Sequence, residues 1–585
     1  MAGGMTSIYI GVSGVQSAQI ALNTTTHNLS NVYTPGYTRQ LSFTSDRNYN
    51  NIGYGALEKK QVGLGVQSSV TSRVRDLLLD KSYRTEYGRQ GFYEAQSEVI
   101  EEIETIMGET ESVGFREALD NLWSAFNEMS KTPDNIVSRS ELVMYAEAFM
   151  SRAQAVYTEL TDYQKNLDTK ILATMNRVNE LGDLINDVNL KIAGIEAGVE
   201  NANDLRDKRD NYLDELSNLV KISYTEQTNG YVSVMAEGVP FVTDGGVYHM
   251  ETRQLDGDEG SMYLSCVWPY LDDQEVFLLE QEINTNNKND IGMLKGYLLG
   301  RGDYRADYTD VPEVKDYDVT TDEGLNDYLA AVKKYNGAIG NSSVAQAQAL
   351  FDKLVNGVVT TINDIFSPIT AQVPEGVTTY TDAAGNTYEA SQVKILDRDV
   401  STGDDGELPP QELFSRKYTD RYIEVTGDDG NTYYVYNEKN SFDKESLYTI
   451  SNMDMNQVIR EDYSKLPFRT PEGDNDLQKG ADLVETWNEQ KMTLDPGNMA
   501  KLTFKEYYRQ MVYTLGNKGS LYNSIATSQK QATDQIDEAR TVITGVSSEE
   551  ELTNMIKFQG AYNASSRYVT AVAEMLQYII DRLGS

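Results

Sequence analysis

The sequence contains few of the residues on which most catalytic and metal-binding sites depend. Its 585 residues include two histidines, His27 and His249, and one cysteine, Cys266. The chain therefore has few residues from which to form a Ser-His-Asp triad or a His/Cys metal site. One thiol cannot form an intrachain disulfide. We expect Cys266, which lies between Leu264 and Trp268 in a strand-like run, to be a small buried hydrophobe. The sequence predicts no catalytic residue, no metal ligand and no cofactor.

Long apolar runs and positive charge are also scarce. The chain has no run of about 18 apolar residues that could span a bilayer, and no Lys or Arg precedes its first apolar stretch, unlike a Sec-type signal peptide. Lys and Arg number 51 against 90 Asp and Glu, which gives a formal net charge of −39. This charge repels phosphate backbones and anionic lipid. The composition therefore favours a multidomain protein of the secreted type, with neither nucleic acid nor membrane as a partner.

Both ends of the chain carry apolar residues at heptad spacing, the pattern of coiled coils. A lone apolar stripe stays exposed, so pairing the two stripes is the simplest way to bury both. Both chain ends would then emerge from one pole of the molecule, as suits a subunit that polymerises through its ends. We predict that this subunit-assembly interface consists of Ile8, Val12, Val15, Leu22 and Leu29 near the start and of Met555, Phe558, Tyr562, Val569, Val572, Leu576, Ile579 and Leu583 near the end.

A short motif follows the first stripe. The helix must stop at Pro35-Gly36, because Pro lacks an N–H and Gly tolerates positive φ. The surrounding sequence resembles the N-terminal signature of the bacterial flagellar axial family of rod, hook and hook-associated proteins, although many members have Ile and Ala where this chain has Leu29 and Ser30. The residues that carry the resemblance are Asn28, Asn31, Thr34, Pro35, Gly36 and Tyr37.

Three further stretches, 115–139, 203–217 and 545–576, are similar to the hook-associated protein 1 branch of that family, the junction subunits between hook and filament. The resemblance implies a structural, non-enzymatic subunit that lies outside the cell and leaves it by flagellar type III export without a cleaved signal peptide. The partners it implies are further copies in a ring or helical layer, the hook protein, the second junction protein, and an export chaperone at the C-terminal helix.

Two other interpretations remain open. The chain could be another axial subunit, such as a hook-type protein, a filament protein or the second junction protein. The Thr-Pro-Gly-Tyr sequence speaks against a filament protein, and residues 203–217 speak against the second junction protein. The chain could also be an axial scaffold that carries an extracellular hydrolase in residues 368–495, although nothing singles out a pair of its acidic residues.

Periodicity predicts a multidomain α+β fold. A long helix carries two heptad lines, one through Leu160 and one through Ile171, and from Lys221 the period changes to two. Residues 381–388 and 426–433 are near copies that predict two related hairpins. We therefore expect a terminal paired-helix (coiled-coil) domain of residues 1–45 and 547–585, a helical-bundle inner domain of 46–220, 325–367 and 496–546, a β-rich domain of 221–324, and a β-rich outer inserted domain of 368–495.

Three smaller signals have structural interpretations. The charged run 203–210 predicts ion pairs at helical spacing, Asp204 with Lys208 and Arg206 with Asp210. Residues 301–303 spell Arg-Gly-Asp, an adhesion tripeptide, which we interpret as the end of a helix. Ser547 and the glutamates after it have the spacing of a capping box at the start of the last helix.

Overall fold

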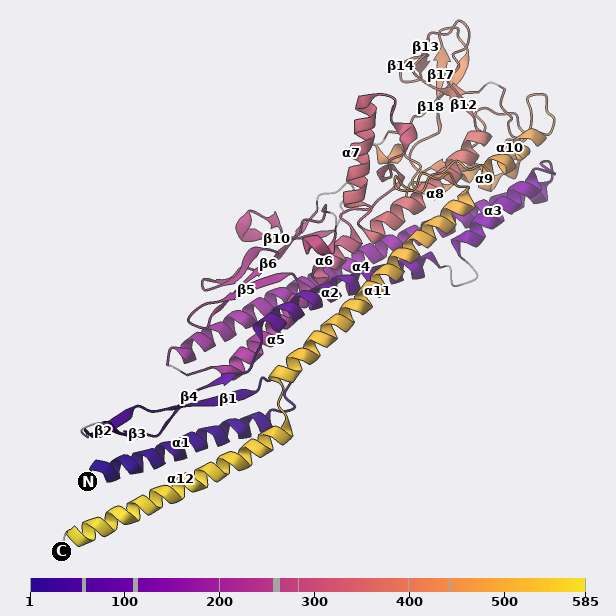
Figure 1. Ribbon diagram of the computed structural model, residues 1–585. Coiled ribbons are helices and arrows are strands. Elements are labelled where there is room, and N and C mark those ends of the chain that lie inside the picture. Colours follow the sequence, from indigo (N-terminus) through magenta and orange to yellow (C-terminus); the bar gives the residue numbers. More distant parts are fainter. Residues whose placement is uncertain are drawn as a thin grey trace.

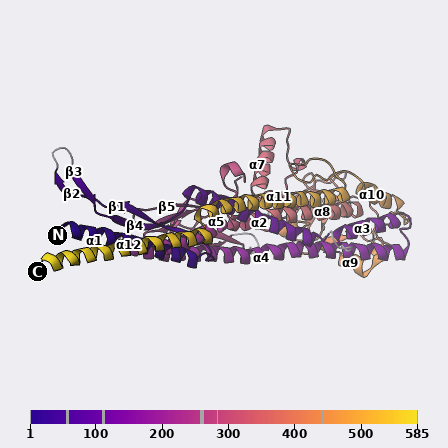
Figure 2. The ribbon, with the colours of Figure 1, turned by 60° about the horizontal axis from the view of Figure 1, so that its bottom comes forward.

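The computed structural model describes residues 2–54, 59–108, 114–198, 200–255, 263–281, 283–397, 399–440 and 443–583. The molecule is elongated (Figure 1), with two long terminal helices at one pole, a body of long helices, and small β units along one side and at the far end. The N- and C-termini lie at the same pole in both views (Figures 1 and 2). Among the described residues, no helix combines the length and the apolar character needed to cross a membrane.

The terminal unit consists of two helices and two antiparallel strand pairs. Helix α1 packs against α12 on one side and against the β1–β4 ladder on the other (Figure 1). Strands β1 and β4 pair with each other, and β2 pairs with β3. The elements are α1 (Ala2–Ser30), β1 (Gln40–Asp46), β2 (Tyr49–Tyr54), β3 (Lys59–Gly63), β4 (Val66–Arg73) and α12 (Ser548–Leu583).

These strands differ from the expectation that residues from 46 onward are helical. Polar residues and Gly occupy most positions of these four strands, so the sequence shows neither the period of an amphipathic helix nor clean alternation. Strand β1 is buried at Gln40 and exposed from Phe43 onward. A strand with so little burial carries no hydrophobic pattern that could reveal it.

The body is a bundle of long helices in which α11 lies along α2. Its elements are α2 (Leu77–Met107), α3 (Phe115–Met129), α4 (Ile136–Glu196), α5 (Asn203–Leu219), α6 (Met293–Arg301), α8 (Ser343–Phe366) and α11 (Phe504–Thr544). Helix α4 is 61 residues long. Its two predicted heptad lines are buried along most of the helix, since Leu160, Leu167, Ile171, Val178 and Leu181 are 0% exposed, whereas Ile195 near its end is 39% exposed and Val199 lies outside the described residues. The prediction of a long bundle helix is therefore confirmed.

Local sequence sets the ends of the body helices. Helix α2 begins after Asp76, whose carboxylate accepts from the backbone N–H groups of Leu78 and Leu79, and it ends at Gly108 with φ of 67°. Helix α11 begins with a capping box in which Thr503 and Glu506 satisfy each other's backbone N–H groups. Helix α6 ends at Arg301, and Gly302 follows with φ of 78°. The interpretation of Arg301-Gly302 as a helix stop is therefore confirmed.

Four β units and three shorter helices complete the molecule. Strands β5 (Ile222–Glu226), β6 (Val232–Ala236), β7 (Val239–Thr243) and β8 (Gly246–Val247) form a four-stranded antiparallel sheet in that order, and β9 (Glu251–Gln254), β10 (Leu264–Trp268) and β11 (Gln274–Glu275) form another with β10 in the middle. The outer sheet has six strands in the order β12 (Ile369–Thr370), β15 (Ile395–Leu396), β18 (Thr432–Tyr436), β17 (Tyr422–Gly427), β13 (Thr379–Asp382) and β14 (Thr387–Glu389). Strands β16 (Phe414–Arg416) and β19 (Met453–Met455) pair alone, and the remaining helices are α7 (Asp322–Ala338), α9 (Gln457–Glu461) and α10 (Leu477–Trp487).

The two near-identical segments form neighbouring hairpins of the outer sheet, as predicted. Strand β13 pairs with β14 and also with β17, which pairs with β18. An aspartate fixes each turn, because Asp382 accepts from the backbone N–H of Asn386 at 2.8 Å and Asp429 accepts from that of Asn431 at 3.0 Å. Tyr433 also supports the second turn, since its hydroxyl donates to Asp429 at 2.9 Å. These acidic turns are therefore held by their own hydrogen bonds.

Residues 368–495 divide between two hydrophobic cores. The outer sheet has a small core of its own around Tyr380, Val425 and Tyr433. By contrast, Phe414 and Trp487 belong to the large core that the body helices build. The outer sheet is thus the self-contained part of this block, and the rest of the block packs into the body.

Asp352 of α8 connects the body with two peripheral segments. Its carboxylate is 0% exposed and accepts the backbone N–H of Tyr308 at 2.9 Å and that of Ile450 at 2.7 Å. Burial, reinforced by the nearby charge of Asp307, raises the pKa of Asp352 from 3.8 to about 8. The folded protein therefore keeps a proton here that the unfolded chain releases.

We predict that the Asp352→Asn variant changes how stability depends on pH. Because the folded pKa is raised, the contribution of Asp352 is fully present below about pH 4 and is lost as pH rises through about 8, by up to ~1.4 kcal/mol per pH unit. Scanning calorimetry from pH 5 to pH 9 should show the melting temperature of the parent protein falling relative to that of the variant. A difference between the two proteins that stays constant over this range would contradict the assignment.

Candidate assembly site and the joint behind it

Small residues allow α1 and α12 to approach each other closely. A Cβ added at Gly11 would lie 2.6 Å from Val569 Cγ2, and one added at Gly14 would lie 2.8 Å from Ser565 Oγ. On the side of the hairpins, the Ser13 hydroxyl accepts the backbone N–H of Val66 at 3.1 Å. Helix α1 is therefore held between α12 and β4 with little room for larger side chains.

The predicted stripes occupy these two paired helices, with most side chains half-buried. Val12, at 36%, and Ile579, at 45%, are exposed, and the side chain of Leu583 lies outside the described residues. The half-buried members are Ile8, Val15, Leu22, Leu29, Met555, Phe558, Tyr562, Val569, Val572 and Leu576. The structure thus brings the two stripes onto neighbouring helices of one subunit.

A second line of large apolar side chains faces solvent on the same pair of helices, and the sequence analysis did not single it out. On α12, Ile556 is 73% exposed, Met575 65%, Tyr578 59% and Ile580 60%, and on α1 Tyr9 is 65% exposed. Met575 and Tyr578 lie three residues apart on α12, a spacing that could have indicated a second apolar face. An exposed line of this kind marks a surface for another protein.

The family motif forms a compact turn at the end of α1. Asn28, which is 1% exposed, donates to the backbone carbonyl of Gln40 and accepts from its N–H, at 2.9 and 3.0 Å. The Tyr37 hydroxyl donates to Asn28 Oδ1 at 2.8 Å. Asn31 Nδ2 donates to the His27 carbonyl at 3.0 Å and its Oδ1 accepts from the Thr34 hydroxyl at 3.1 Å. The motif side chains therefore fix the path of the chain between α1 and β1.

The same turn rests against α5. Gly36 has φ of 73°, and a Cβ there would lie 2.1 Å from Asn211 Oδ1, so backbone conformation and space both require glycine. Pro35, which precedes it, is exposed. His27 contacts the Tyr37 hydroxyl at 2.9 Å through Nδ1, and its Nε2 lies 3.5 Å from Asp204 of α5. His27 is thus part of the joint between the terminal unit and the body.

Arg39 connects the motif to the start of α12. Its guanidinium donates to Glu551 at 2.8 Å and to Glu550 at 2.8 and 3.2 Å, and its backbone N–H donates to the carbonyl of Thr544 at the end of α11. Glu551 is 1% exposed. The Ser547 hydroxyl accepts the backbone N–H of Glu550 only at 3.5 Å. The glutamates predicted to complete a capping box therefore bind Arg39.

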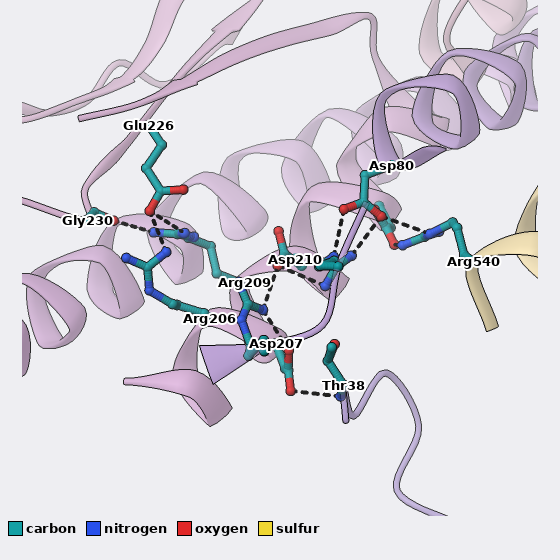
Figure 3. Close-up of polar contacts among 12 residues, drawn as sticks. Thr38, Asp80, Arg206, Asp207, Arg209, Asp210, Glu226, Gly230 and Arg540 are labelled. Carbon is teal, nitrogen blue, oxygen red and sulfur yellow. Dashed lines mark hydrogen bonds and ion pairs between the residues drawn. The ribbon is translucent and has the colours of Figure 1, made fainter. Parts of the chain in front are cut away.

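Asp210 of α5 lies at the centre of the joint between the terminal unit and the body (Figure 3). It accepts from Arg73 and Arg75 at 2.9 Å each and from Arg84 at 3.2 Å. Arg73 also donates to Asp207 at 2.6 Å, which in turn accepts the backbone N–H of Thr38 at 2.9 Å. Strand β4, the connection to α2, and α2 itself are thus all tied to one helix.

Arg540 of α11 extends this network to the C-terminal half of the chain. It contacts Asp80 at 3.0 Å and Asp214 at 2.7 Å, and Figure 3 shows it approaching Asp80 from the side opposite Asp210. Arg75 donates to the same Asp80 at 2.7 Å. The carboxylates of α2 and α5 therefore bind arginines from both halves of the chain.

Burial alone would raise the pKa of Asp210, but the charges of Arg75, Arg84 and Arg73 outweigh burial and hold that pKa well below its usual range. Asp210 is therefore ionised at any physiological pH. Removing this carboxylate would leave three guanidinium groups short of a counter-charge in a largely buried site.

The pairs predicted within the run 203–210 do not form among the described residues, so that prediction was wrong. Arg206 binds Glu196 at 2.6 Å and Glu226 at 2.5 Å, and Asp210 binds the arginines named above. Asp204 accepts from Gln40 at 2.8 Å. Partners between 10 and 164 residues away outcompete the helical neighbours, because a buried charge-assisted hydrogen bond is stronger than an exposed helical pair.

The residues with catalytic or ligand potential are in structural positions. Cys266 is 1% exposed, and burial raises its pKa to about 12, so its thiol is protonated. Arg301 is 0% exposed and bonded to Asp168, so the arginine of the Arg-Gly-Asp tripeptide is inaccessible, whereas Asp303 is exposed. Within the described ranges, no group of His, Cys, Asp and Glu has an arrangement that could hold a metal ion.

Three families of flagellar proteins match parts of the chain. Residues 100–368 match the family described as flagellar hook-associated protein FlgK helical domain. Residues 8–38 match the flagella basal body rod protein family, and residues 543–582 match the C-terminal family of the flagellar basal body rod FlgEFG proteins. These two terminal matches cover most of α1 with the motif and most of α12.

Full-length relatives agree with these families. The chain is 23% identical to flagellar hook-associated protein 1 of Bacillus subtilis over 99% of both chains. It is 22% identical to the protein of that name from Salmonella typhimurium and 23% identical to that from Escherichia coli, each over 97% of this chain and 98% of the relative. A solved structure of the flagellar hook junction protein FlgK from Burkholderia pseudomallei aligns over 79% of this chain and 100% of its own, with a TM-score of 0.49 and 12% identity.

We predict that the Gly11→Ala variant separates the two terminal helices. The new methyl group would lie 2.6 Å from Val569, and such overlap typically costs ~1–3 kcal/mol. Hydrogen exchange measured by mass spectrometry should show faster exchange in α1 and α12. Gly560→Ala is the matched control, because a Cβ there meets nothing within 4 Å. Unchanged exchange in Gly11→Ala would show that the close approach is not needed.

We also predict that Asp210→Asn loosens the joint. Breaking a buried charge network by removing one partner costs about 3–5 kcal/mol, whereas Asp187→Asn, which breaks an exposed pair with Lys191, should cost under ~0.5 kcal/mol. Because the pKa of Asp210 is lowered, its contribution is present at neutral pH and is lost in acid, so the difference from the parent should shrink below about pH 4. Calorimetry tests both points. Equal melting temperatures for the two variants at pH 7 would contradict the role of Asp210.

Proposed function

The chain belongs to the flagellar hook-associated protein 1 family, and from this premise we propose that it is the structural subunit that joins hook to filament, assembling through its N- and C-terminal helices. Membership of this family makes it a structural component of the flagellum, outside the cell, that assembles with other hook and filament components. We propose no enzymatic activity for it.

The observation that carries the proposed mode of assembly is the exposed apolar line on α12. The close seam with α1 already occupies one face of the helix, so Ile556, Met575 and Tyr578 remain for a neighbouring subunit. Burying one such side chain is worth roughly 1.5–3 kcal/mol. A contact between this line and a different surface of the next copy is heterologous, and repeating it produces a ring or a helical layer.

The joint gives this assembly a defined geometry. Arg73 of β4 donates to Asp210 of α5, and the backbone N–H groups of Thr38 and Arg39 donate to Asp207 and Thr544, so hydrogen bonds of fixed direction tie the terminal unit to the body. Charge-assisted hydrogen bonds to a guanidinium constrain orientation more than apolar contacts do. The long helices of the body would then keep a fixed angle to the layer that the terminal helices form, as a connection between two rigid structures requires.

The finer features of the proposal follow from the same surfaces. We propose that residues 1–45 and 547–585 form the assembly domain, that the hook protein and the second junction protein contact it at the two sides of the layer, and that an export chaperone covers the apolar line of α12 before assembly. Export would follow the flagellar type III route. In this arrangement the body helices form the inner part of the subunit and the β units the outer part.

We predict that Ile556→Glu combined with Met575→Glu abolishes assembly without unfolding the subunit. Both side chains are exposed, so glutamate costs the monomer little but puts charge into the contact between subunits. In cells that lack their own copy, electron microscopy should show hooks without filaments. Gln559→Glu combined with Gln577→Glu, which adds the same charge at exposed positions of α12, should restore filaments. Full-length filaments from the first double variant would refute the proposed contact.

A further inference from the structure

A cleft of about 840 Å³ lies between strand β5, helix α5 and the start of α2. All residues from Lys221 to Glu226 line one wall, and Arg73 to Arg84, together with residues of α5, line the other. The cleft adjoins the joint but is separate from the terminal helices that the proposed function uses. Nothing in the assembly through α1 and α12 accounts for it.

The charge of this cleft is opposite to that of the protein. Eight of its lining residues are Lys or Arg and three are Asp or Glu, in a chain whose formal net charge is −39. Several of its arginines have carboxylate partners in the joint. Lys81, Lys221 and Lys288, by contrast, make no ion pair with any residue that the structure describes, and Lys81 and Lys288 are exposed. Free positive charge is therefore available at the mouth of the cleft.

Arg209 adds a buried donor to the same cleft. Its side chain is 2% exposed, and its guanidinium donates to Gly230 at 2.6 Å and to Asn189 at 3.1 Å. Its Nε has no hydrogen-bond partner among the described residues. Its guanidinium also lies 3.6 Å from Glu226 of β5, so Arg209 is held by the protein's own acceptors at the wall of the cleft.

The wall formed by β5 is an open sheet edge. Strand β5 pairs with β6 and, among the described strands, with no other. Lys221 and Gln227, just outside β5, form backbone hydrogen bonds with residues just outside β6. Bonded and non-bonded pairs alternate along an antiparallel ladder, so every second residue of β5 bonds toward β6. The N–H and C=O groups of Ile222, Tyr224 and Glu226 therefore point away from β6, and none of them bonds to another element within the part of the chain that the structure describes.

An open strand edge accepts a further strand from another polypeptide. The five residues of β5 offer about 17 Å of edge at ~3.4 Å per residue. Carboxylates on alternate residues of an incoming strand would all project to one face, which can be the face of the lysines. A short acidic segment brings its carboxylates to this edge without the additional repulsion that a whole second copy, with the same large negative charge, has to overcome.

We propose that this cleft binds an extended, carboxylate-rich segment of a partner protein, which adds to the edge of β5 and places its acidic side chains against Lys81, Lys221 and Lys288. The backbone bonds to Ile222, Tyr224 and Glu226 supply affinity, and the lysines select acidic sequences. This binding surface is independent of the terminal helices, so it is present in the unassembled subunit.

The test uses the full-length monomer and a fluorescein-labelled peptide of eight residues that alternates Glu and Val. Fluorescence anisotropy should show saturable binding, and hydrogen exchange by mass spectrometry should show protection of residues 221–227. A peptide that alternates Lys and Val should not bind. A peptide that alternates Glu and Pro should bind at least tenfold more weakly, because Pro has no N–H for the ladder.

Charge reversal identifies the site. Lys81→Glu combined with Lys288→Glu should weaken binding at least tenfold, whereas Lys334→Glu combined with Lys530→Glu, which reverses two exposed lysines elsewhere, should change it less than twofold. If both double variants lost binding to the same extent, net charge alone would explain the effect and the proposal would be overturned. Two further results would show that the cleft is a simple anion site and would overturn the proposal. One is that the Glu/Pro peptide binds as tightly as the Glu/Val peptide. The other is that millimolar inorganic phosphate alone displaces the Glu/Val peptide. Sedimentation of the protein without peptide should show a monomer. If it showed a dimer that the Lys81/Lys288 double variant abolishes, the occupant would be a second copy of this chain, and the assignment to a partner protein would be overturned.

Discussion

Asp210 accepts hydrogen bonds from three arginines, and the position of the terminal helices depends on them. Arg73 ends β4, Arg75 lies in the connection to α2, and Arg84 lies within α2. A single carboxylate of α5 thus fixes the path of the chain as it leaves the terminal hairpin and enters the body. Arg540 does the same for the returning chain through Asp80 and Asp214. The joint is polar, so its cohesion comes from paired charges and not from a shared apolar core. A polar joint suits a subunit whose terminal helices must remain distinct from its body, because it defines an orientation without merging the two hydrophobic cores.

The terminal helices show how one pair of helices can be both closed within a subunit and open toward the next. Close packing at Gly11 and Gly14 lets α1 and α12 approach without using their largest side chains. Those side chains are then distributed around the pair, some half-buried in the seam and others, such as Ile556 and Met575, exposed. If the largest apolar side chains of α1 and α12 packed between the two helices, they would all be buried within the monomer. Small residues in the seam leave that surface for contacts between subunits.

Much of this fold could be predicted from periodicity, and the failures have separate physical causes. The heptads of α4 and the twin hairpins are repeated patterns within short segments, and the structure confirms both. The pairing of α1 with α12 followed from two matching stripes at opposite ends. What the sequence could not supply was the choice of partners among 90 acidic and 51 basic residues. Asp210 was assigned to Arg206, four residues away, whereas its partners lie more than a hundred residues earlier in the chain. The strands between residues 40 and 73 were missed because they bury few side chains, and the exposed line on α12 was missed because only one stripe per helix was sought.

The ionisation of an aspartate in this protein depends on the groups that surround it. The outer hairpins use Asp382 and Asp429 to hold their own turns, so acidic groups at the surface contribute local order and keep copies apart in solution. In the body, Asp352 is buried near the charge of Asp307 and retains its proton at neutral pH. At the joint, Asp210 is buried among arginines and stays ionised. The same side chain thus has three electrostatic states, set in each case by which groups the fold brings within a few ångströms. The excess of acidic over basic residues in the whole chain does not determine the charge at any one place. The β5 cleft shows this, because cations outnumber acids among the residues that line it.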